Sequence, residues 1–346
     1  MNRTNTRVLI VSCEVGPGAW WHQSEMLREA FPKDDPSLSL VDDGDEADLI
    51  FITDLRDRYD HFRNIREHPL VQKYPDRCFT VGEDDKPARW LRGVQTSIKR
   101  SAFNFHRFHS GSYTLFHPDF LNPYIREAAS RATPPERNKT LLFAFTGRAC
   151  IPLRERLFQT TFYRSDILVR NTTGFHAFTH DQGGRDAAAR EYFETMLSCK
   201  FALCPRGLGT SSIRLFEAMS LGVAPIIVSD AWVPPLGPKW EEFALFVKED
   251  ALDRIEPLAV AHESEWAERG LKAREAYLNY FTTEGYVRYL VEAARDIQRR
   301  QLIPERWVHR LWPIAINYER VRRRLTQYKK RYFERDEAMR KTPQNA

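Results

Sequence analysis

The stretch "CPRGLGTSSIRLFEAMSLGVAPIIVSD", Cys204–Asp230, decides the fold because it links a strand end, a turn, a helix and a second strand. Pro205 fixes the backbone angle φ and Gly207 relaxes it, so the chain can turn directly after the apolar lead-in. The hydroxyl residues Thr210–Ser212 then favour the start of a helix. A glycine ends that helix, and a second apolar run returns to the core. The stretch therefore predicts a unit of a parallel α/β sheet.

The same stretch crowds charged side chains around the predicted helix start. Arg206 precedes the helix and Arg214 lies in its first turn, where unpaired N–H groups already favour a phosphate. Glu217 shares a helix face with Arg214, and its carboxylate suits ribose hydroxyls. These parts could hold a nucleotide. Equally, Arg214 and Glu217 could form only an ion pair on a solvated face, with Ser212 only a cap, and the residues alone leave both interpretations open.

Short apolar segments alternate with helical patterns in both halves of the chain, which predicts two α/β domains joined by the polar, proline-containing linker 132–140. Strands are predicted at 7–12, 46–55, 76–85, 140–148, 166–170, 201–205, 223–230 and 243–247, and helices at 24–31, 154–162, 190–200 and 211–222. Ligands are expected between the domains, at the carboxyl ends of the strands. We expect domains at 1–138 and 139–302, followed by a basic helical extension at 303–346.

Composition narrows the class of protein. A hydrophobic content of 42% supports sizeable cores, and a net charge of +5 permits an acidic ligand without requiring one. The five cysteines are an odd number without C-x-x-C spacing, which predicts reduced, mostly buried thiols and neither a zinc site nor a disulfide framework. The sequence shows neither a signal-peptide core nor an apolar run of membrane-spanning length, so we expect a cytoplasmic protein.

Four segments carry a resemblance to a known family. They are "FALCPRG" (201–207), "IRLFEA" (213–218), "GVAPIIVSDAWVPPL" (222–236) and "FALFVKEDAL" (243–252). Their order and spacing resemble the exostosin family of glycosyltransferases, family 47. "LLFAFTGR" with "LRERL" (141–157) and "ADLIFIT" (47–53) fit more loosely. The resemblance implies a GT-B fold, in which two facing Rossmann-like domains enclose a cleft, and transfer of a sugar from a nucleotide-sugar, usually UDP-linked, to a growing glycan with inversion.

The resemblance also implies roles for particular residues. Those expected to bind the donor are Gly147, Arg148, Arg206, Gly207, Ser212, Arg214 and Glu217, with Glu217 on the ribose and the others near the diphosphate. Many GT-B enzymes carry a second Glu eight positions before the first. Gly209 stands there in this chain, so that part of the pattern is absent.

The expected chemistry needs no metal ion or other cofactor, because a GT-B site stabilises the leaving diphosphate with helix dipoles and arginines. Asp43-Gly44-Asp45 resembles the metal-binding Asp-x-Asp of GT-A enzymes, but it lies in a polar stretch typical of an exposed turn. We therefore interpret it as a turn and predict no metal site.

An inverting transfer also needs a base to take the proton of the acceptor hydroxyl. The candidates follow the predicted strands of the first domain: Glu14, His22, Asp54 and Glu83. Each could instead be a surface or capping residue, and the sequence does not choose among them. His106, His109 and His117 lie in an aromatic segment, where packing or stacking on an acceptor sugar would account for them.

The segment Tyr318–Phe333 has helical periodicity, with one apolar stripe and faces dense in Arg and Lys. The stripe comprises Tyr318, Val321, Leu325, Tyr328 and Tyr332. The helix could pack on the domains, or contact an anionic membrane or a lipid-linked glycan acceptor. Nucleic acid is not an expected partner, because no binding motif accompanies the charge.

The leading hypothesis is thus an inverting, metal-independent glycosyltransferase that uses a UDP-sugar and a glycan or polysaccharide acceptor. The alternatives are another GT-B enzyme, such as a nucleotide-sugar epimerase, or a non-catalytic glycan-binding or scaffold protein. Binding of UDP would favour either enzyme over the scaffold, and sugar transfer would separate transferase from epimerase.

Overall fold

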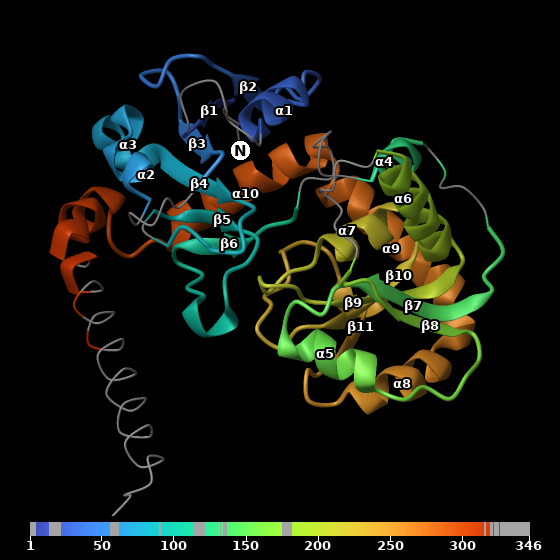
Figure 1. Cartoon of the computed structure of the whole chain (residues 1–346). Helices are drawn as coiled ribbons and strands as arrows, with labels where there is room; N and C mark the ends of the chain where they lie inside the picture. The colour runs from blue at the N-terminus through green and yellow to red at the C-terminus, as the bar shows by residue number, and fades with distance from the viewer. Residues whose placement is uncertain are drawn as a thin grey trace, which may run out of the picture.

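The computed structural model describes residues 5–13, 22–55, 62–89, 91–113, 122–131, 133, 137–174, 182–314, 316–318, 321 and 325. They form two α/β domains that lie side by side, each around its own sheet (Figure 1). Both sheets are parallel throughout, and their central strands are buried along their whole length. Strands buried on both faces are near-continuous apolar runs in sequence, which is why most of them are predictable from it.

The sheet of the first domain has the strand order β2-β1-β3-β4-β5-β6. Its strands are β1 (Thr6–Ser12), β2 (Leu38–Leu40), β3 (Leu49–Thr53), β4 (Cys78–Gly82), β5 (Gly93–Gln95) and β6 (Phe108–Ser110). Its own helices are α1 (Gln23–Glu29), α2 (Arg63–Glu67) and α3 (Pro69–Lys73). The predicted strands at 7–12, 46–55 and 76–85 are confirmed. The three-residue strands β2, β5 and β6 were not predicted, because they are too short to give a periodic pattern.

The sheet of the second domain has the order β11-β10-β9-β7-β8. Its strands are β7 (Leu141–Gly147), β8 (Ile167–Asn171), β9 (Cys199–Pro205), β10 (Ala224–Val228) and β11 (Leu245–Val247). Its helices include α5 (Pro152–Gln159), α6 (Gln182–Leu197), α7 (Ile213–Ser220), α8 (Ile255–Ala261) and α9 (Trp266–Tyr280). All five strands and the helices at 154–162, 190–200 and 211–222 were predicted. In both sheets the strand order reverses beside the first strand of the domain, which creates a crevice at the carboxyl edge.

Two helices pack in a different domain from the one that their place in the sequence suggests. Helix α4 (Pro123–Ala129) precedes the linker, yet its apolar residues lie in the core of the second domain. Helix α10 (Thr283–Arg300) follows the second domain, yet its apolar face lies in the core of the first, against β1, β3, β4 and β5. The packing of these two helices thus crosses the expected boundaries at 138/139 and 302, because burial of an apolar face, rather than chain order, decides which core a helix joins.

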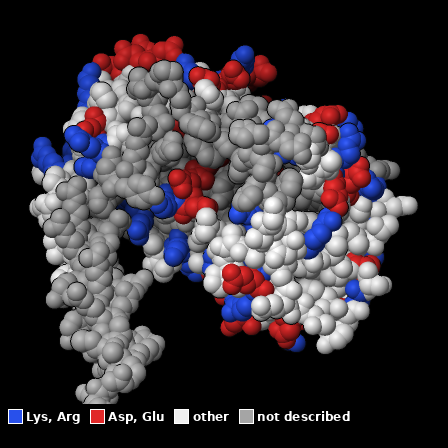
Figure 2. Space-filling model, viewed as in Figure 1, with Lys and Arg blue, Asp and Glu red and all other residues white. Residues whose placement is uncertain are grey.

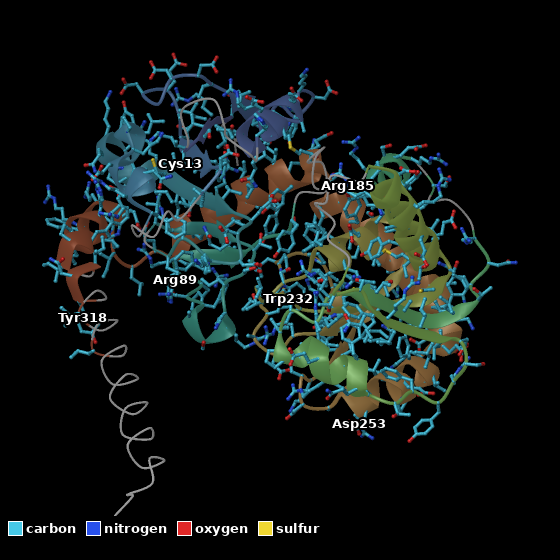
Figure 3. The ribbon with its side chains drawn as sticks, in the orientation of Figure 1. Cys13, Arg89, Arg185, Trp232, Asp253 and Tyr318 are labelled. Atoms are coloured by element: carbon cyan, nitrogen blue, oxygen red, sulfur yellow. The ribbon has the colours of Figure 1, made fainter. Side chains whose placement is uncertain are left out.

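The carboxyl edges of the two sheets face each other, and the loops that follow the strands are in contact. Arg100 of the first domain donates its backbone N–H to the Ala231 carbonyl at 2.7 Å and a guanidinium N–H to the Trp232 carbonyl, also at 2.7 Å. Trp232 is buried where the halves meet (Figure 3). The Thr210 hydroxyl lies 3.5 Å from the Ile98 carbonyl across the same contact. These observations confirm the predicted GT-B architecture of two facing Rossmann-like domains.

The start of the C-terminal extension is helical over 305–314 and 316–318, and packs on the first domain through Trp312 and Ile316. The helix lies on the side of that domain away from the second domain (Figure 1). Tyr328 and Tyr332 of the predicted stripe lie outside the described residues. Across the described part of the chain, the helices are all too short or too polar to span a bilayer.

Candidate active site

Two arginines cross the crevice between β7 and β9 in opposite directions. Arg154, on the helix after β7, donates to the Pro205 carbonyl at 3.1 Å and to the Arg206 carbonyl at 2.9 Å, where β9 ends. Arg214, on the helix after β9, donates to the Thr146 carbonyl at 2.5 Å, where β7 ends. Each guanidinium is therefore fixed at the carboxyl edge, at the point where this fold class binds its ligands.

The two positive charges are close enough to affect each other. Burial and the nearby charge of Arg214 lower the pKa of Arg154 to about 10. Both guanidinium groups also lie over the ring of Phe145, with ring-centroid distances of 5.3 Å for Arg154 and 4.4 Å for Arg214. In the described part of the chain, no carboxylate forms a salt bridge with Arg154. Two neighbouring cations repel each other, so this crevice favours a multiply charged anion.

Arg214 and Glu217 meet through a third side chain that the sequence did not single out. Arg214 donates from Nε to the Tyr192 hydroxyl at 3.0 Å, and Tyr192 donates to Oε2 of Glu217 at 2.6 Å. Arg214 is 9% exposed and Glu217 6% exposed, so the alternative of an ion pair on a solvated face is wrong. Burial raises the pKa of Glu217 above its usual range, and the Tyr192 hydrogen bond and Arg214 oppose that shift.

The start of α7 carries hydroxyl groups that are not used as caps. Ser212 occupies the N-cap position, but its side chain makes no capping hydrogen bond. The Ser211 hydroxyl is buried and makes no hydrogen bond within the described residues. A Cβ built on Gly207 would have Arg154 Nη2 as its nearest neighbour, at 3.6 Å, so the turn lies directly beside that guanidinium. The N-terminus of α7, Gly207 and Arg154 thus all lie at the crevice between β7 and β9.

Arg206, expected at the diphosphate, is engaged elsewhere. Its guanidinium forms two parallel hydrogen bonds with Glu249, at 2.8 Å and 3.0 Å, which tie the end of β9 to the loop after β11. Gly147 ends β7 as expected, and a Cβ there would lie 2.7 Å from the Phe145 ring. Arg148 follows it and is exposed. Of the predicted donor residues, Gly147, Gly207, Ser212, Arg214 and Glu217 therefore gather around the crevice, with Arg148 at its rim.

Gly209, which stands where the GT-B pattern has a second Glu, lies at a close contact between the domains. A Cβ at this position would lie 2.3 Å from the Ser97 hydroxyl and 2.5 Å from Oδ1 of Asp85, both in the first domain. Contacts this short are not tolerated, so a side chain at position 209 would require Ser97 and Asp85 to move. The glycine thus allows Ser97 and Asp85 of the first domain to approach this turn closely.

The predicted bases lie in different surroundings. Asp54 is 5% exposed and accepts the backbone N–H groups of Gln23, at 2.8 Å, and Ser24, at 3.3 Å. It thereby caps the start of α1, which is the structural alternative stated above. His22 is exposed, with Nδ1 3.3 Å from a Glu25 oxygen. Glu83 accepts a hydrogen bond from the Gln23 side chain at 2.6 Å. Glu14 lies outside the described residues.

Asp85, which the sequence analysis missed, is an acidic residue of the first domain that contacts the second domain. It accepts the Gly209 backbone N–H, and the Tyr113 hydroxyl lies 3.4 Å from its Oδ1. Burial and the adjacent Asp84 raise the pKa of Asp85, while Arg154 across the contact opposes the shift. Figure 2 shows acidic side chains gathered in the middle of this face, between the two halves. The sequence feature that could have identified Asp85 is its position after β4, two residues beyond the predicted base Glu83.

The remaining sequence-based interpretations concern structure. His109 is buried with Nε2 2.9 Å from Asp296 of α10, and His106 lies 2.6 Å from the Arg300 carbonyl, so both pack against the returning helix. His117 is outside the described residues. Asp43 accepts the Asp45 N–H at 2.9 Å in an exposed turn, as predicted. Within the described residues, metal-ligand side chains do not cluster in threes. Four cysteines are buried and Cys150 is exposed, which confirms mostly buried thiols.

A family model described as the Exostosin GT47 domain matches residues 51–262. The chain is 31% identical to Exostosin-1 of Drosophila melanogaster over 160 residues, which cover 42% of this chain and 21% of that protein. It is 29% identical to the Exostosin-1 homolog of Caenorhabditis elegans over 51% of this chain and 50% of that protein. A probable glucuronosyltransferase of Oryza sativa subsp. japonica is 37% identical over 21% of this chain and 18% of its own length. The matches thus span half or less of these curated relatives.

Among solved structures, a glycosyltransferase from Rickettsia africae aligns with 85% of this chain and 98% of its own, at 10% identity and a TM-score of 0.38. WaaG, a glycosyltransferase involved in lipopolysaccharide biosynthesis, aligns with 84% of this chain and 99% of its own, at 12% identity and a TM-score of 0.34.

Proposed function

Because the chain belongs to the exostosin family, glycosyltransferase family 47, we propose that it transfers a sugar from a UDP-sugar to a glycan acceptor, with inversion and without a metal ion. One observation carries this proposal: Arg154 and Arg214 cross the crevice of the second domain as neighbouring cations beside a helix N-terminus. A nucleoside diphosphate has the charge and the size to lie between them.

The chemistry follows from where charge develops. When the bond between sugar and phosphate breaks, the diphosphate gains negative charge. Arg154 and Arg214 are held by backbone carbonyls and an aromatic ring, so they need little reorganisation as that charge appears. Removing one such fixed donor from an active site typically costs about 10²–10³ in turnover. Glu217, oriented by Tyr192, accepts the ribose hydroxyls on the inner side of the site.

We assign the role of base to Asp85, with Glu83 as the alternative. Asp85 is in the first domain but contacts the Gly209 turn of the second, beside Arg154. A sugar attached to a diphosphate at Arg154 therefore presents its reacting carbon to this carboxylate. A raised pKa improves a carboxylate as a proton acceptor, as long as it is ionised at the working pH. The rest of the acceptor glycan binds on the side of the first domain, against the loops that follow its strands.

The test is titration calorimetry with UDP in EDTA, followed by transfer assays with a panel of UDP-sugars. UDP-glucuronate belongs in the panel because the rice relatives are named probable glucuronosyltransferases. Binding that persists in EDTA and transfer to an oligosaccharide support the proposal. Binding that disappears on chelation overturns the metal-independent mechanism. Conversion of one UDP-sugar into another without an acceptor would instead indicate an epimerase, and absence of UDP binding would indicate a scaffold.

A further inference from the structure

The C-terminal extension presents an exposed apolar stripe, defined by Trp307, Leu311, Ile314, Tyr318, Val321 and Leu325. Each of these side chains is half or more exposed. Their spacing alternates between four and three residues, which keeps them on one side of a helix. Figure 3 labels Tyr318 at the outer end of the described helix, away from the body of the first domain. Contiguous exposed apolar residues of this kind mark an interaction surface.

The opposite side of the same helix is already occupied. Trp312 and Ile316 are each 3% exposed and lie in a core cluster of the first domain. The helix is therefore anchored in a fixed orientation, and the exposed stripe is not the face it uses to fold. Leu302 and Ile303, immediately before the helix, are 78% and 57% exposed and extend the apolar surface beyond the helix itself.

Arginines lie beside the apolar surface, and Arg and Lys are frequent in the sequence that follows it. Leu302 and Ile303 line a groove of about 380 Å³ together with Arg89 and Arg107. The exposed Arg306 and Arg310 lie on the helix itself. Arg107 pairs with Glu305 at 2.7 Å and Arg306 lies 3.6 Å from Asp76, so part of this charge is already balanced. Along the following sequence, Arg and Lys occupy positions 320, 322, 323, 324, 329, 330 and 331, against one acidic residue, Glu319, in the same segment. A partner that is both apolar and negatively charged would therefore complement this surface.

We propose that this surface binds the interface of an anionic lipid bilayer. An apolar stripe that contains Trp and Tyr, flanked by Arg and Lys, is suited to lie in the plane of a membrane, with its rings at the headgroup level and its cations on anionic lipids. A bilayer also accepts the neighbouring Leu302 and Ile303, which a single partner helix would leave uncovered. A second copy of this chain fits less well, because it would bring the same excess of Arg and Lys at 320–331, and like charges oppose each other.

The proposal stands independently of the enzymatic one and is tested by vesicle co-sedimentation of the full chain at about 0.15 M salt. The probes are phosphatidylcholine vesicles with and without about 30% phosphatidylserine. We expect binding to the anionic vesicles only. The double substitution Leu311→Gln/Ile314→Gln should weaken it about tenfold or more. The matched control is Leu271→Gln/Leu278→Gln, which changes two exposed leucines of α9 in the second domain and should bind normally.

A second variant tests the charge. The triple substitution R322Q/R323Q/R324Q should weaken binding to anionic vesicles by about tenfold or more, and raising the salt concentration should do the same. Circular dichroism confirms that each variant is folded. Equal binding to neutral vesicles, or no binding to either kind, overturns the proposal. A concentration-dependent dimer in light scattering that L311Q/I314Q abolishes also overturns it, because it assigns the stripe to a second copy of the chain.

Discussion

Tyr192 donates its phenolic hydrogen to Oε2 of Glu217 over 2.6 Å, and its oxygen accepts the Nε–H of Arg214 over 3.0 Å. Helix α6 thereby fixes two buried charged side chains of α7, and it supplies the hydrogen bond that the Glu217 carboxylate accepts. The same hydroxyl sets the positions of a cation expected at the diphosphate and of a carboxylate expected at the ribose. Tyr192 is thus a positioning residue at the centre of the proposed donor site.

The substitution Tyr192→Phe removes this hydroxyl and leaves both partners buried. We expect the free energy of unfolding to fall by about 1–3 kcal/mol, the usual cost of an unsatisfied buried polar group, and the affinity for UDP to fall as well. Urea unfolding and titration calorimetry measure the two effects. Tyr163→Phe is the control, because Tyr163 is 89% exposed. A Tyr192→Phe protein with normal stability and UDP affinity would show that the bridge has no role.

The substitution Arg154→Ala should weaken UDP binding by about 2–5 kcal/mol, the range for truncating one member of a desolvated charge pair. Calorimetry measures it, with Arg137→Ala as a matched arginine control, since Arg137 is exposed in the linker and lies 3.5 Å from Glu194. Arg214→Ala should weaken UDP binding similarly, and should also destabilise the fold, because it leaves Glu217 buried without its neighbouring cation. Unchanged UDP affinity in Arg154→Ala would contradict the diphosphate site.

The substitution Asp85→Asn should lower turnover by about 10²–10⁴-fold, the range for a positioned acid or base, and leave UDP binding nearly intact. A base must be ionised, so wild-type turnover should fall as the pH drops through the raised pKa of Asp85. Side-by-side assays of Asp85→Asn, Glu83→Gln and the adjacent Asp84→Asn identify the group. If only Glu83→Gln loses transfer, the base is Glu83, and normal transfer in all three would place it elsewhere.

Stability should depend on pH through His109. Burial lowers the pKa of His109, although Asp296 at 2.9 Å opposes the shift. The folded state therefore binds fewer protons at His109 than the unfolded state does. The contribution of the neutral His109 to the free energy of unfolding is present above the unfolded-state pKa of about 6.5, and it is lost as the pH falls below that value. His109→Gln should flatten the change in urea midpoint between about pH 8 and pH 5. The exposed His22→Gln is the control and should retain the wild-type slope.

Cys150 should be the thiol that reacts fastest. It is exposed, whereas burial raises the pKa values of Cys78, Cys199 and Cys204 to about 12. Its sulfur also lies 3.7 Å from Arg154 Nη1. N-ethylmaleimide followed by mass spectrometry should label Cys150 first, and UDP should slow that labelling. Labelling that is equally fast with saturating UDP would indicate that the nucleotide lies away from Arg154.

The local sequence determined most of the strands, the turn that carries Gly207, and the helix α7 that begins after Ser212 and carries Arg214 and Glu217. Buried parallel strands need continuous apolar runs, and a helix start beside a strand end needs hydroxyl and glycine residues, so both leave a pattern within a few positions. The same reasoning placed candidate bases after the strands of the first domain. It could also list Asp54 among them, but it could not tell a base from the cap of α1.

Only the tertiary structure decided which distant residues complete the site. Arg154, Tyr192 and Asp85 come from three separate segments, and each acquires its role from a partner 25 or more positions away. The sequence likewise predicts the apolar side of a helix without identifying the sheet that the side will cover, so the return of α10 to the first domain was invisible in it. Local patterns reflect what the backbone requires over a few residues, whereas long-range packing decides which side chains meet. The contact of Gly209 with the first domain leaves a single sign in the local sequence, which is the glycine itself.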